Sequence, residues 1–249
     1  MDLGLDGRVA LVMGASAGIG RAVAAALVRE GARVAIASRT EERIQAAAAE
    51  IGATPFVADA SDSERLARLP IEVTEAMGGP AEILVLNTGG PPPGGALDHG
   101  FEEWQDAYAS LVLAPRILTG GVVPAMQAAG WGRIVNVGST TTIEPNPALS
   151  LSNVHRAAAV GFLKTLAGEV AADGITVNTV ATGRFRTDRM AELYGSIEAV
   201  EEAAAAEVPA RRLGTPEEYG DLVAFLCSDR AAYITGTVIP IDGGLLRST

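Results

Sequence analysis

Three glycines stand in a short segment whose spacing suits it to bind phosphate. The segment follows an apolar run at 8–13 and continues into the first turn of a helix-like stretch at 18–30. Gly14 can turn the chain tightly off a strand, Gly18 lets the backbone approach a pyrophosphate, and Gly20 lets a helix pack closely on a sheet. The start of the helix would offer free N–H groups and a positive dipole end to the phosphates. The expected contacts of this turn are Gly14, Ser16, Gly18, Ile19 and Gly20.

The end of the second apolar run indicates which dinucleotide the turn would bind. That run, at 33–38, finishes at Ser38, and Arg39 follows it. An acidic residue at this place accepts a hydrogen bond from the free 2′-hydroxyl of NAD, whereas a guanidinium favours the 2′-phosphate of NADP. We therefore expect NADP(H), and the alternative is that Arg39 is only an exposed residue at a strand end.

Short apolar runs alternate with longer, alanine-rich stretches along the whole chain. Such runs are typical of parallel strands that are buried on both faces, and the stretches between them have helical periodicity. The expected strands are 8–13, 33–38, 54–58, 82–86, 133–138, 175–180 and 237–241. The expected helices are 18–30, 41–50, 62–77, 101–128, 151–172 and 215–228. This order predicts an α/β fold: a single doubly wound (Rossmann) domain over 1–249, with a parallel sheet of about seven strands.

An irregular region at 183–212 interrupts the last pair of strand and helix. It contains an alanine- and glutamate-rich helix, and an insertion at this place is a candidate lid over a substrate. Its polar side chains hint at an anionic or polar substrate group, although exposed charges explain the pattern equally well. These side chains are Arg184, Arg186, Asp188, Arg189 and Glu192.

The bulk composition argues against several classes of protein. The chain has 19 basic and 30 acidic residues and a net charge of −11, so its average surface repels nucleic acid and anionic lipid. No basic segment followed by a long apolar run opens the sequence, and no apolar stretch of about 18 residues occurs, so we expect a cytoplasmic protein outside the membrane. Cys227 is the only cysteine, so we expect no disulfide, and no metal site is predicted.

From Gly14 to Gly244 the sequence resembles the short-chain dehydrogenase/reductase family, and in particular its 3-oxoacyl-(acyl-carrier-protein) reductases. The glycine spacing G-x3-G-x-G is typical of that family, although Ala17 stands where the family has a second basic residue. The resemblance implies a small carbonyl or alcohol substrate, and it implies further cofactor contacts in the loops after later strands. These are Asp59 and Ala60 at the adenine, Asn87, Thr88 and Gly89 in a loop related to N-N-A-G, and Thr182, Gly183 and Thr187 at the nicotinamide.

The catalytic positions of the family are altered in this chain. The resemblance identifies Ser139 as the serine that polarises the substrate carbonyl. The tyrosine of the family's Y-x-x-x-K motif lies thirteen residues later, where this chain has Ser152, and the lysine position holds Arg156. The family's asparagine on the preceding helix aligns with Leu111. The chain is thus an atypical member that lacks the tyrosine and the lysine.

These replacements weaken the expected chemistry without abolishing it. A phenol has a pKa near ~10 that can be tuned toward neutrality, whereas an aliphatic hydroxyl is a far weaker acid and arginine keeps its proton. Losing a general acid typically costs about 10²- to 10⁴-fold in rate. Arg156 could still donate to the nicotinamide ribose, and its positive charge could stabilise a developing alkoxide.

Two other side chains could supply a proton. His155 lies on the predicted helix roughly 60° to one side of Ser152, at about 100° per residue. Its reference pKa of ~6.5 suits proton transfer at neutral pH, and the alternative is a packed structural histidine. Tyr194, in the candidate lid, could bring a hydroxyl when the lid closes. His99, in a region rich in glycine and proline, is expected to face solvent.

We therefore expect an NADP(H)-dependent oxidoreductase that interconverts a ketone and a secondary alcohol with an altered proton donor. Two alternatives stay open: a cofactor-binding protein with little or no redox turnover, acting as a sensor or structural partner, and a non-redox lyase or isomerase on the same scaffold. The resemblance also implies subunit contacts through the helices at 101–128 and 151–172 and the terminal segment 237–244, and hence a homotetramer, with a dimer as the alternative.

Overall fold

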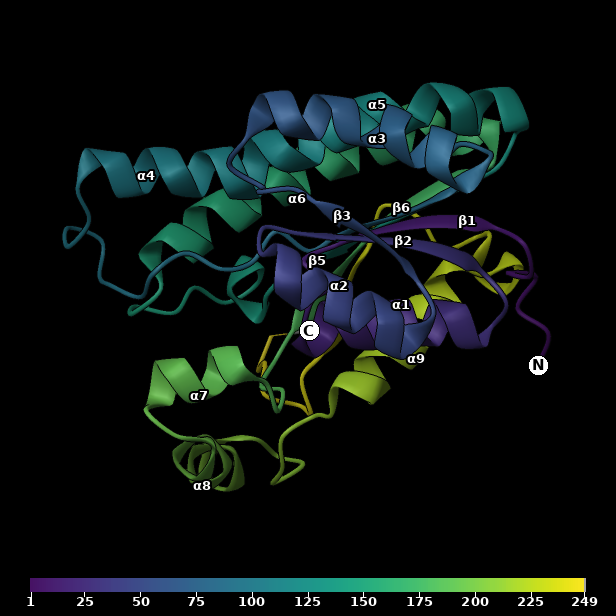
Figure 1. Cartoon of the computed structure of the whole chain (residues 1–249). Helices are drawn as coiled ribbons and strands as arrows, with labels where there is room; N and C mark the ends of the chain where they lie inside the picture. The colour runs from purple at the N-terminus through teal and green to yellow at the C-terminus, as the bar shows by residue number, and fades with distance from the viewer. Residues whose placement is uncertain (249) are drawn as a thin grey trace.

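The structure, a computed structural model, describes residues 1–248 and contains one seven-stranded parallel sheet between two layers of helices (Figure 1). Thr249, the last residue of the predicted domain, lies outside the described residues. The strands are β1 (Val9–Met13), β2 (Arg33–Ser38), β3 (Thr54–Val57), β4 (Ile83–Leu86), β5 (Gly132–Val137), β6 (Ile175–Thr182) and β7 (Val238–Ile241). Their order in the sheet is β3-β2-β1-β4-β5-β6-β7, which confirms the doubly wound fold.

The strand order reverses at β1, and this reversal positions the site. β1 pairs in parallel with β2 on one side and with β4 on the other, and all five of its residues are buried. The chain leaves β1 and β4 toward opposite faces of the sheet, so a crevice opens beyond their carboxyl ends, where open α/β sheets bind their ligands. The loops after β1, β4, β5 and β6 meet there.

Each face of the sheet has its own apolar core. One face is covered by α1 (Gly18–Arg29), α2 (Glu41–Ile51) and α9 (Pro216–Cys227), and the other by α3 (Ser63–Met77), α5 (Ala114–Ala129) and α6 (Ser150–Val170) (Figure 1). The two groups of buried residues share no member, because successive strand residues point to opposite faces. Every predicted strand and helix is present within two residues of its predicted ends, except at 101–128.

The stretch 101–128, predicted as one helix, has an irregular centre. It divides into α4 (Phe101–Tyr108), a π-helical turn at Ala109–Leu113 and α5. Leu111, which the sequence resemblance aligns with the family's asparagine, is buried in the π-helical turn. By length and composition, Phe101–Ala129 is apolar enough to cross a membrane. In the structure α5 packs against α3, α6 and the strands β4 and β5, as a helix of the layer that covers the sheet.

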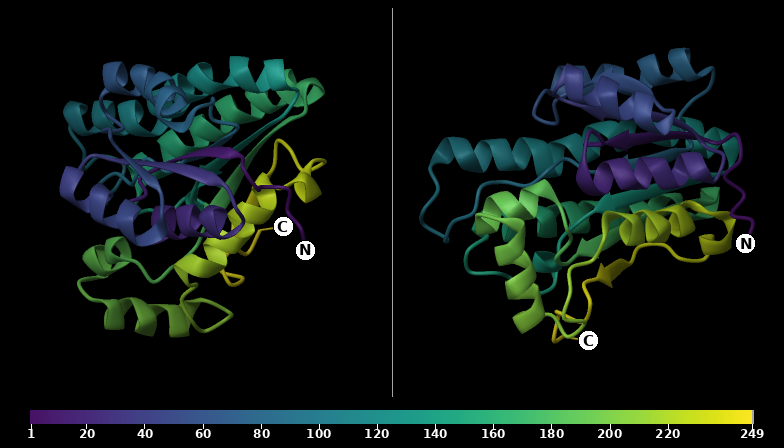
Figure 2. Two further views of the ribbon diagram at one scale, coloured as in Figure 1. Left: turned by 45° about the vertical axis from the view of Figure 1, so that its right-hand side comes forward. Right: turned by 60° about the horizontal axis from the view of Figure 1, so that its bottom comes forward.

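The candidate lid contains two helices, of which the sequence predicted one. These are α7 (Asp188–Tyr194) and α8 (Ile197–Glu207), and Figure 2 shows them standing apart from the two helix layers. Thr187 and Ser196 cap them, because each side-chain oxygen accepts a backbone N–H of the first turn. Their apolar side chains form a small core of their own around Val200 and Ala204.

Candidate active site

The glycine turn after β1 has no room for side chains. Gly14 and Gly18 have φ values of +59° and +53°, which L-residues rarely adopt. A Cβ at Gly14 would lie 2.2 Å from the carbonyl oxygen of Asn87, and a Cβ at Gly20 would lie 2.2 Å from the carbonyl oxygen of Gly14. The Asn87 side chain also donates a hydrogen bond to the Gly14 carbonyl at 3.1 Å. The close approach of the loops after β1 and β4 therefore depends on glycine.

The first turn of α1 is open to an anion. Ala17 is the N-cap residue, and no side chain accepts a hydrogen bond at this helix start. The amide groups and the positive dipole end are thus available to phosphate oxygens. Thr187, the N-cap residue of α7, lies against this turn, because a Cβ at Gly18 would be 3.3 Å from its methyl group.

The end of β2 has a buried side-chain oxygen without a hydrogen-bond partner in the described residues. The hydroxyl of Ser38 is buried and makes no hydrogen bond within residues 1–248. Arg39 is exposed and forms no ion pair in the same part of the chain. Asp59 accepts hydrogen bonds from the backbone N–H and the hydroxyl of Ser61 at 2.9 and 2.8 Å. The Ser61 N–H, with a smaller contribution from the Arg39 charge, holds the pKa of Asp59 below its usual range.

These features fit a dinucleotide that has a phosphate on its adenosine ribose. The glycine turn and the uncapped helix accept a pyrophosphate, and the unpaired Ser38 hydroxyl beside a free Arg39 suits a 2′-phosphate. The remaining predicted contacts in these loops are half-buried, namely Ser16, Ile19, Ala60 and Thr88.

The loop after β6 packs against the segment that follows β7. Gly183 lies so close to the segment after β7 that a Cβ there would be 2.5 Å from the Cα of Asp242. The Thr182 hydroxyl donates to the phenol oxygen of Tyr219 at 3.0 Å. Tyr219 is fully buried, and burial raises its pKa above the usual range, so it stays neutral. Sequence reasoning did not identify Tyr219, which lies in a regular apolar helix pattern.

Arg156 connects three elements at the centre of the site. Its Nε donates to the Ser152 hydroxyl at 3.2 Å, its Nη1 to the Val137 carbonyl at 2.9 Å and its Nη2 to the Gly89 carbonyl at 2.6 Å. The loss of water around the guanidinium lowers the pKa of Arg156 to about 10, with a further lowering by the charge of Arg189. Arg156 therefore stays positively charged at neutral pH.

A row of hydroxyl groups extends from Arg156 toward the end of β5. The Ser152 and Thr141 hydroxyl oxygens lie 3.3 Å apart, and both side chains are buried. The Ser139 hydroxyl accepts the backbone N–H of Thr141 at 3.2 Å. The structure thus joins Ser152 directly to Arg156 and to Thr141, and Ser139 is connected to them through the backbone N–H of Thr141. The three threonines after Ser139 were the only sequence signal for Thr141.

His155 is held on another face of α6. Its Nδ1 donates to the Leu151 carbonyl at 2.8 Å, and its ring packs against Trp104 and Tyr108 with centroid distances of 5.2 and 6.5 Å. In the described residues no hydrogen bond joins His155 to the row of hydroxyls. The structure therefore does not bring His155 together with Ser139, Ser152 and Arg156.

The prediction that His99 faces solvent is wrong. Its side chain is only 4% exposed, with Nδ1 3.2 Å from a carboxylate oxygen of Glu103. The loop at Gly94 pairs with the start of α6, since the Gly94 N–H donates to Ala148 and its carbonyl accepts from Ser150. This pairing lays the loop over the imidazole, and a Cβ at Gly94 would come 2.5 Å from Nε2.

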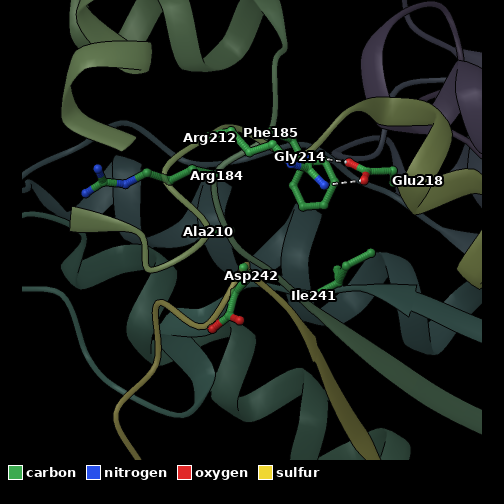
Figure 3. A pocket seen from close by; sticks show the side chains of 9 residues that line it. Arg184, Phe185, Ala210, Arg212, Gly214, Glu218, Ile241 and Asp242 are labelled. Atoms are coloured by element: carbon green, nitrogen blue, oxygen red, sulfur yellow. Dashed lines mark hydrogen bonds and ion pairs between the residues drawn. The ribbon is translucent and has the colours of Figure 1, made fainter. Parts of the chain in front are cut away.

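A separate pocket lies beside the loop after β6, and none of Ser139, Thr141, Ser152 and Arg156 lines it. Figure 3 shows it between Phe185, Gly214 and the end of β7, with the Arg184 side chain directed away from it. Glu218, at its rim, is paired with Arg212 at 2.6 Å. Tyr194 stands in the lid, 40% exposed, with the Arg184 guanidinium 5.5 Å from its ring centre.

Comparison with known proteins agrees with this geometry. Residues 14–246 match the family described as enoyl-(acyl carrier protein) reductase. Dehydrogenase/reductase SDR family member 4 of Homo sapiens is 36% identical over 249 residues, covering 96% of this chain and 88% of that protein. The 3-oxoacyl-(acyl-carrier-protein) reductase of Escherichia coli is 36% identical over 245 residues, covering 98% and 99%. The crystal structure of L-sorbose reductase from Gluconobacter frateurii, complexed with NADPH and L-sorbose, superposes with a TM-score of 0.92 at 32% identity and full coverage of both chains.

Proposed function

Because the chain belongs to the short-chain dehydrogenase/reductase family, we propose that it is an NADP(H)-dependent oxidoreductase that interconverts a ketone and a secondary alcohol with an altered proton donor. One observation carries this proposal. The Ser152 hydroxyl accepts a hydrogen bond from Arg156 and lies 3.3 Å from the Thr141 hydroxyl, and Arg156 also donates to Gly89, in the loop whose Asn87 contacts the glycine turn. A hydroxyl in this arrangement can take over the role of the family's tyrosine.

NADP(H) would be held by the loops already described. The amides at the start of α1 bind the pyrophosphate, and Ser38 with Arg39 binds the 2′-phosphate. Asn87, Thr88 and Gly89 line the ribose on the β4 side, while Thr182, Gly183 and Thr187 hold the nicotinamide from the β6 side. The NADPH complex of the sorbose reductase supports this choice of cofactor.

Hydrogen-bond direction orients the two serines toward the substrate. A guanidinium N–H and a backbone N–H can only donate, so Arg156 and Thr141 occupy lone pairs on the Ser152 and Ser139 oxygens. When the Thr141 hydroxyl also donates to Ser152, the proton of each serine is free to point at an external acceptor. Ser139 and Ser152 would donate together to the carbonyl oxygen of a ketone and polarise it.

When bound, NADPH supplies the hydride that adds to the carbonyl carbon. The Ser152 hydroxyl passes its proton to the oxygen that becomes the alcohol, and water then returns a proton to Ser152. The fixed positive charge of Arg156, 3.2 Å from Ser152, stabilises the oxyanion that Ser152 becomes. Because serine is a weaker acid than tyrosine, we propose a slower proton transfer than in members that have the tyrosine.

Loss of NADPH absorbance in the presence of a broad ketone panel tests the proposal, with secondary alcohols and NADP⁺ for the reverse direction. Calorimetry with NADPH alone is run first, so that cofactor binding is known independently of turnover. Turnover that disappears in a Ser139→Ala, Ser152→Ala double variant supports the proposal. Cofactor binding without turnover on any compound contradicts it and favours the sensor or non-redox alternatives.

We also propose a homotetramer in the cytoplasm. Apolar side chains are exposed on the helices expected to form subunit contacts, including Phe101 and Tyr108 of α4 and Val154 of α6. Such side chains are typical of buried contact surfaces. Light scattering coupled to size exclusion tests the assembly state, and a monomer would contradict it.

A further inference from the structure

The three arginines at the start of the candidate lid, Arg184, Arg186 and Arg189, differ in their acidic partners. Arg184 forms an ion pair with Glu207, and Arg186 forms one with Glu201. The nearest carboxylate to Arg189 is that of Glu192, at 3.9 Å, on a side chain that is 71% exposed. A pair at that distance in solvent contributes little, so the charge of Arg189 is essentially uncompensated.

Arg189 reaches from the lid across the site to the loop after β4. Its Nη2 donates to the Pro91 carbonyl at 2.7 Å. Its Nη2 and Nε lie 3.6 and 3.7 Å from the position that a Cβ on Gly90 would occupy. Because the two atoms are almost equally distant from that position, the Nε–Nη2 edge of the guanidinium faces it. This edge can bind a carboxylate through two parallel hydrogen bonds.

Arg156 approaches the same position from the other side. Its Nη2 lies 3.8 Å from the Cβ position of Gly90, and Gly90 is exposed. The three hydrogen bonds of Arg156 use three of its five N–H groups, so both Nη atoms keep an N–H for another acceptor. Across residues 1–248, no carboxylate forms an ion pair with Arg156.

Two guanidinium groups thus converge beside Gly90, and their one acidic neighbour among residues 1–248 is the exposed Glu192, 3.9 Å from Arg189, in a chain whose net charge is −11. Like charges in such proximity repel, and the charge of Arg189 accordingly lowers the pKa of Arg156. A bound anion removes this repulsion. The amides at the start of α1 already serve a pyrophosphate, and the place beside Gly90 adjoins Ser152, where the carbonyl is reduced.

We propose that the substrate carries a carboxylate that binds between Arg189 and Arg156, so that the protein acts on an oxo acid or on the corresponding hydroxy acid. This inference rests on the proposed function and names its substrate class. Arg156 then contacts both Ser152 and the substrate, because its Nε donates to the Ser152 hydroxyl and its Nη2 can donate to the substrate carboxylate. Arg189 brings the second guanidinium when α7 covers the site.

Matched substrates test the inference. We compare 2-oxo and 3-oxo acids with their methyl esters, which keep the ketone and lose the negative charge. The acids are expected to be preferred in kcat/KM. Arg189→Ala should lower kcat/KM for the acids about 10- to 100-fold and leave the esters nearly unchanged, as for one charge-assisted pair. Arg189→Lys, which keeps the charge and loses the parallel edge, should fall between. Arg186→Ala is the control, since Arg186 is paired with Glu201 on the same lid.

Three results would overturn the inference. An equal or better rate with the esters would do so while leaving the oxidoreductase function intact. An Arg189→Ala variant that loses NADPH affinity by the same factor would assign the arginine to a cofactor phosphate. If NADPH binds and no compound turns over, the proposed function fails, and calorimetry then tests the inference separately. Oxamate should bind the NADPH-loaded protein more tightly than the neutral oxamide, and this preference should be lost in Arg189→Ala. Equal binding of oxamate and oxamide would contradict the inference.

Discussion

The Nε of Arg156 donates a hydrogen bond to the Ser152 hydroxyl at 3.2 Å, across one turn of α6. This contact joins the two residues that we propose stand in for the family's tyrosine and lysine. It connects a charge that persists at neutral pH to a hydroxyl that accepts the hydrogen bond through a lone pair. In the proposed function the two residues therefore act as a pair, and each prediction for one of them depends on the other.

Removing the Ser152 hydroxyl should slow the reaction. We expect Ser152→Ala to lower kcat by about 10²-fold or more, in the range of a lost general acid, while the NADPH dissociation constant stays the same. Single-turnover kinetics and calorimetry measure the two quantities. Ser110→Ala is the control, since its hydroxyl bonds only to backbone carbonyls of α4. An unchanged kcat in Ser152→Ala would assign proton donation to another group.

Restoring the family's residues distinguishes an active site from a lost one. If Ser152 and Arg156 form a working pair, the double variant Ser152→Tyr, Arg156→Lys should lower the native activity, because the phenol fills the place of a small hydroxyl. A large gain of ketone reduction from an inactive parent would instead identify a cofactor-binding protein without turnover. Steady-state rates of both proteins with the same substrate panel decide between the two results.

The cofactor preference should depend on Arg39. Replacing it with alanine is expected to raise the NADPH dissociation constant about 10- to 100-fold, the value of one charge-assisted hydrogen bond, with little effect on NADH. Arg43→Ala, on α2 and outside the predicted cofactor contacts, is the control. Calorimetry with both nucleotides measures the ratio. Equal losses for NADPH and NADH would show that Arg39 does not bind the 2′-phosphate.

The glycine turn should not tolerate a methyl group at the start of α1. A Cβ at Gly20 meets the Gly14 carbonyl oxygen at 2.2 Å, a backbone atom that cannot move aside cheaply. Gly20→Ala should lower the free energy of unfolding by about 1–3 kcal/mol and weaken NADPH binding. Gly161→Ala in α6, where a Cβ meets nothing within 4 Å, should instead raise stability by about 0.5–1 kcal/mol. Denaturant titrations compare them, and equal effects would contradict this account.

Acid should remove one stabilising contact at the start of α9. Hydrogen bonds from Arg212 and from the Thr215 N–H lower the pKa of Glu218 to about 2. A carboxylate with a depressed pKa in the folded state stabilises the protein above its unfolded pKa, and this contribution disappears as pH falls from 4.5 toward about 2. Glu218→Gln should cost about 1 kcal/mol at pH 7, since the pair is largely exposed, and the difference should shrink below pH 4.5. Thermal unfolding at several pH values measures it, and a pH-independent difference would contradict the assignment.

Much of the fold follows from local properties of the sequence. Short apolar runs between turn residues favour buried parallel strands, and the alanine-rich stretches between them favour helices. The π-helical turn at Ala109–Leu113 escaped prediction, because its residues have the same helical periodicity as their neighbours. The second lid helix escaped because α7 has only seven residues and no buried side chain.

The sequence by itself determined the glycine turn and the Ser38–Arg39 pair, and it supplied the proposal that Ser152 and Arg156 stand in for the family's tyrosine and lysine, because these depend on residue type and on spacing along the chain. Only the tertiary structure decided that His155 packs on Trp104, that Thr141 lies against Ser152, and that Arg189 reaches Gly90. The physical reason is that these contacts join residues from different elements of the fold. Their distances depend on how α6, α7 and the strand ends pack together, and residue spacing does not contain that information.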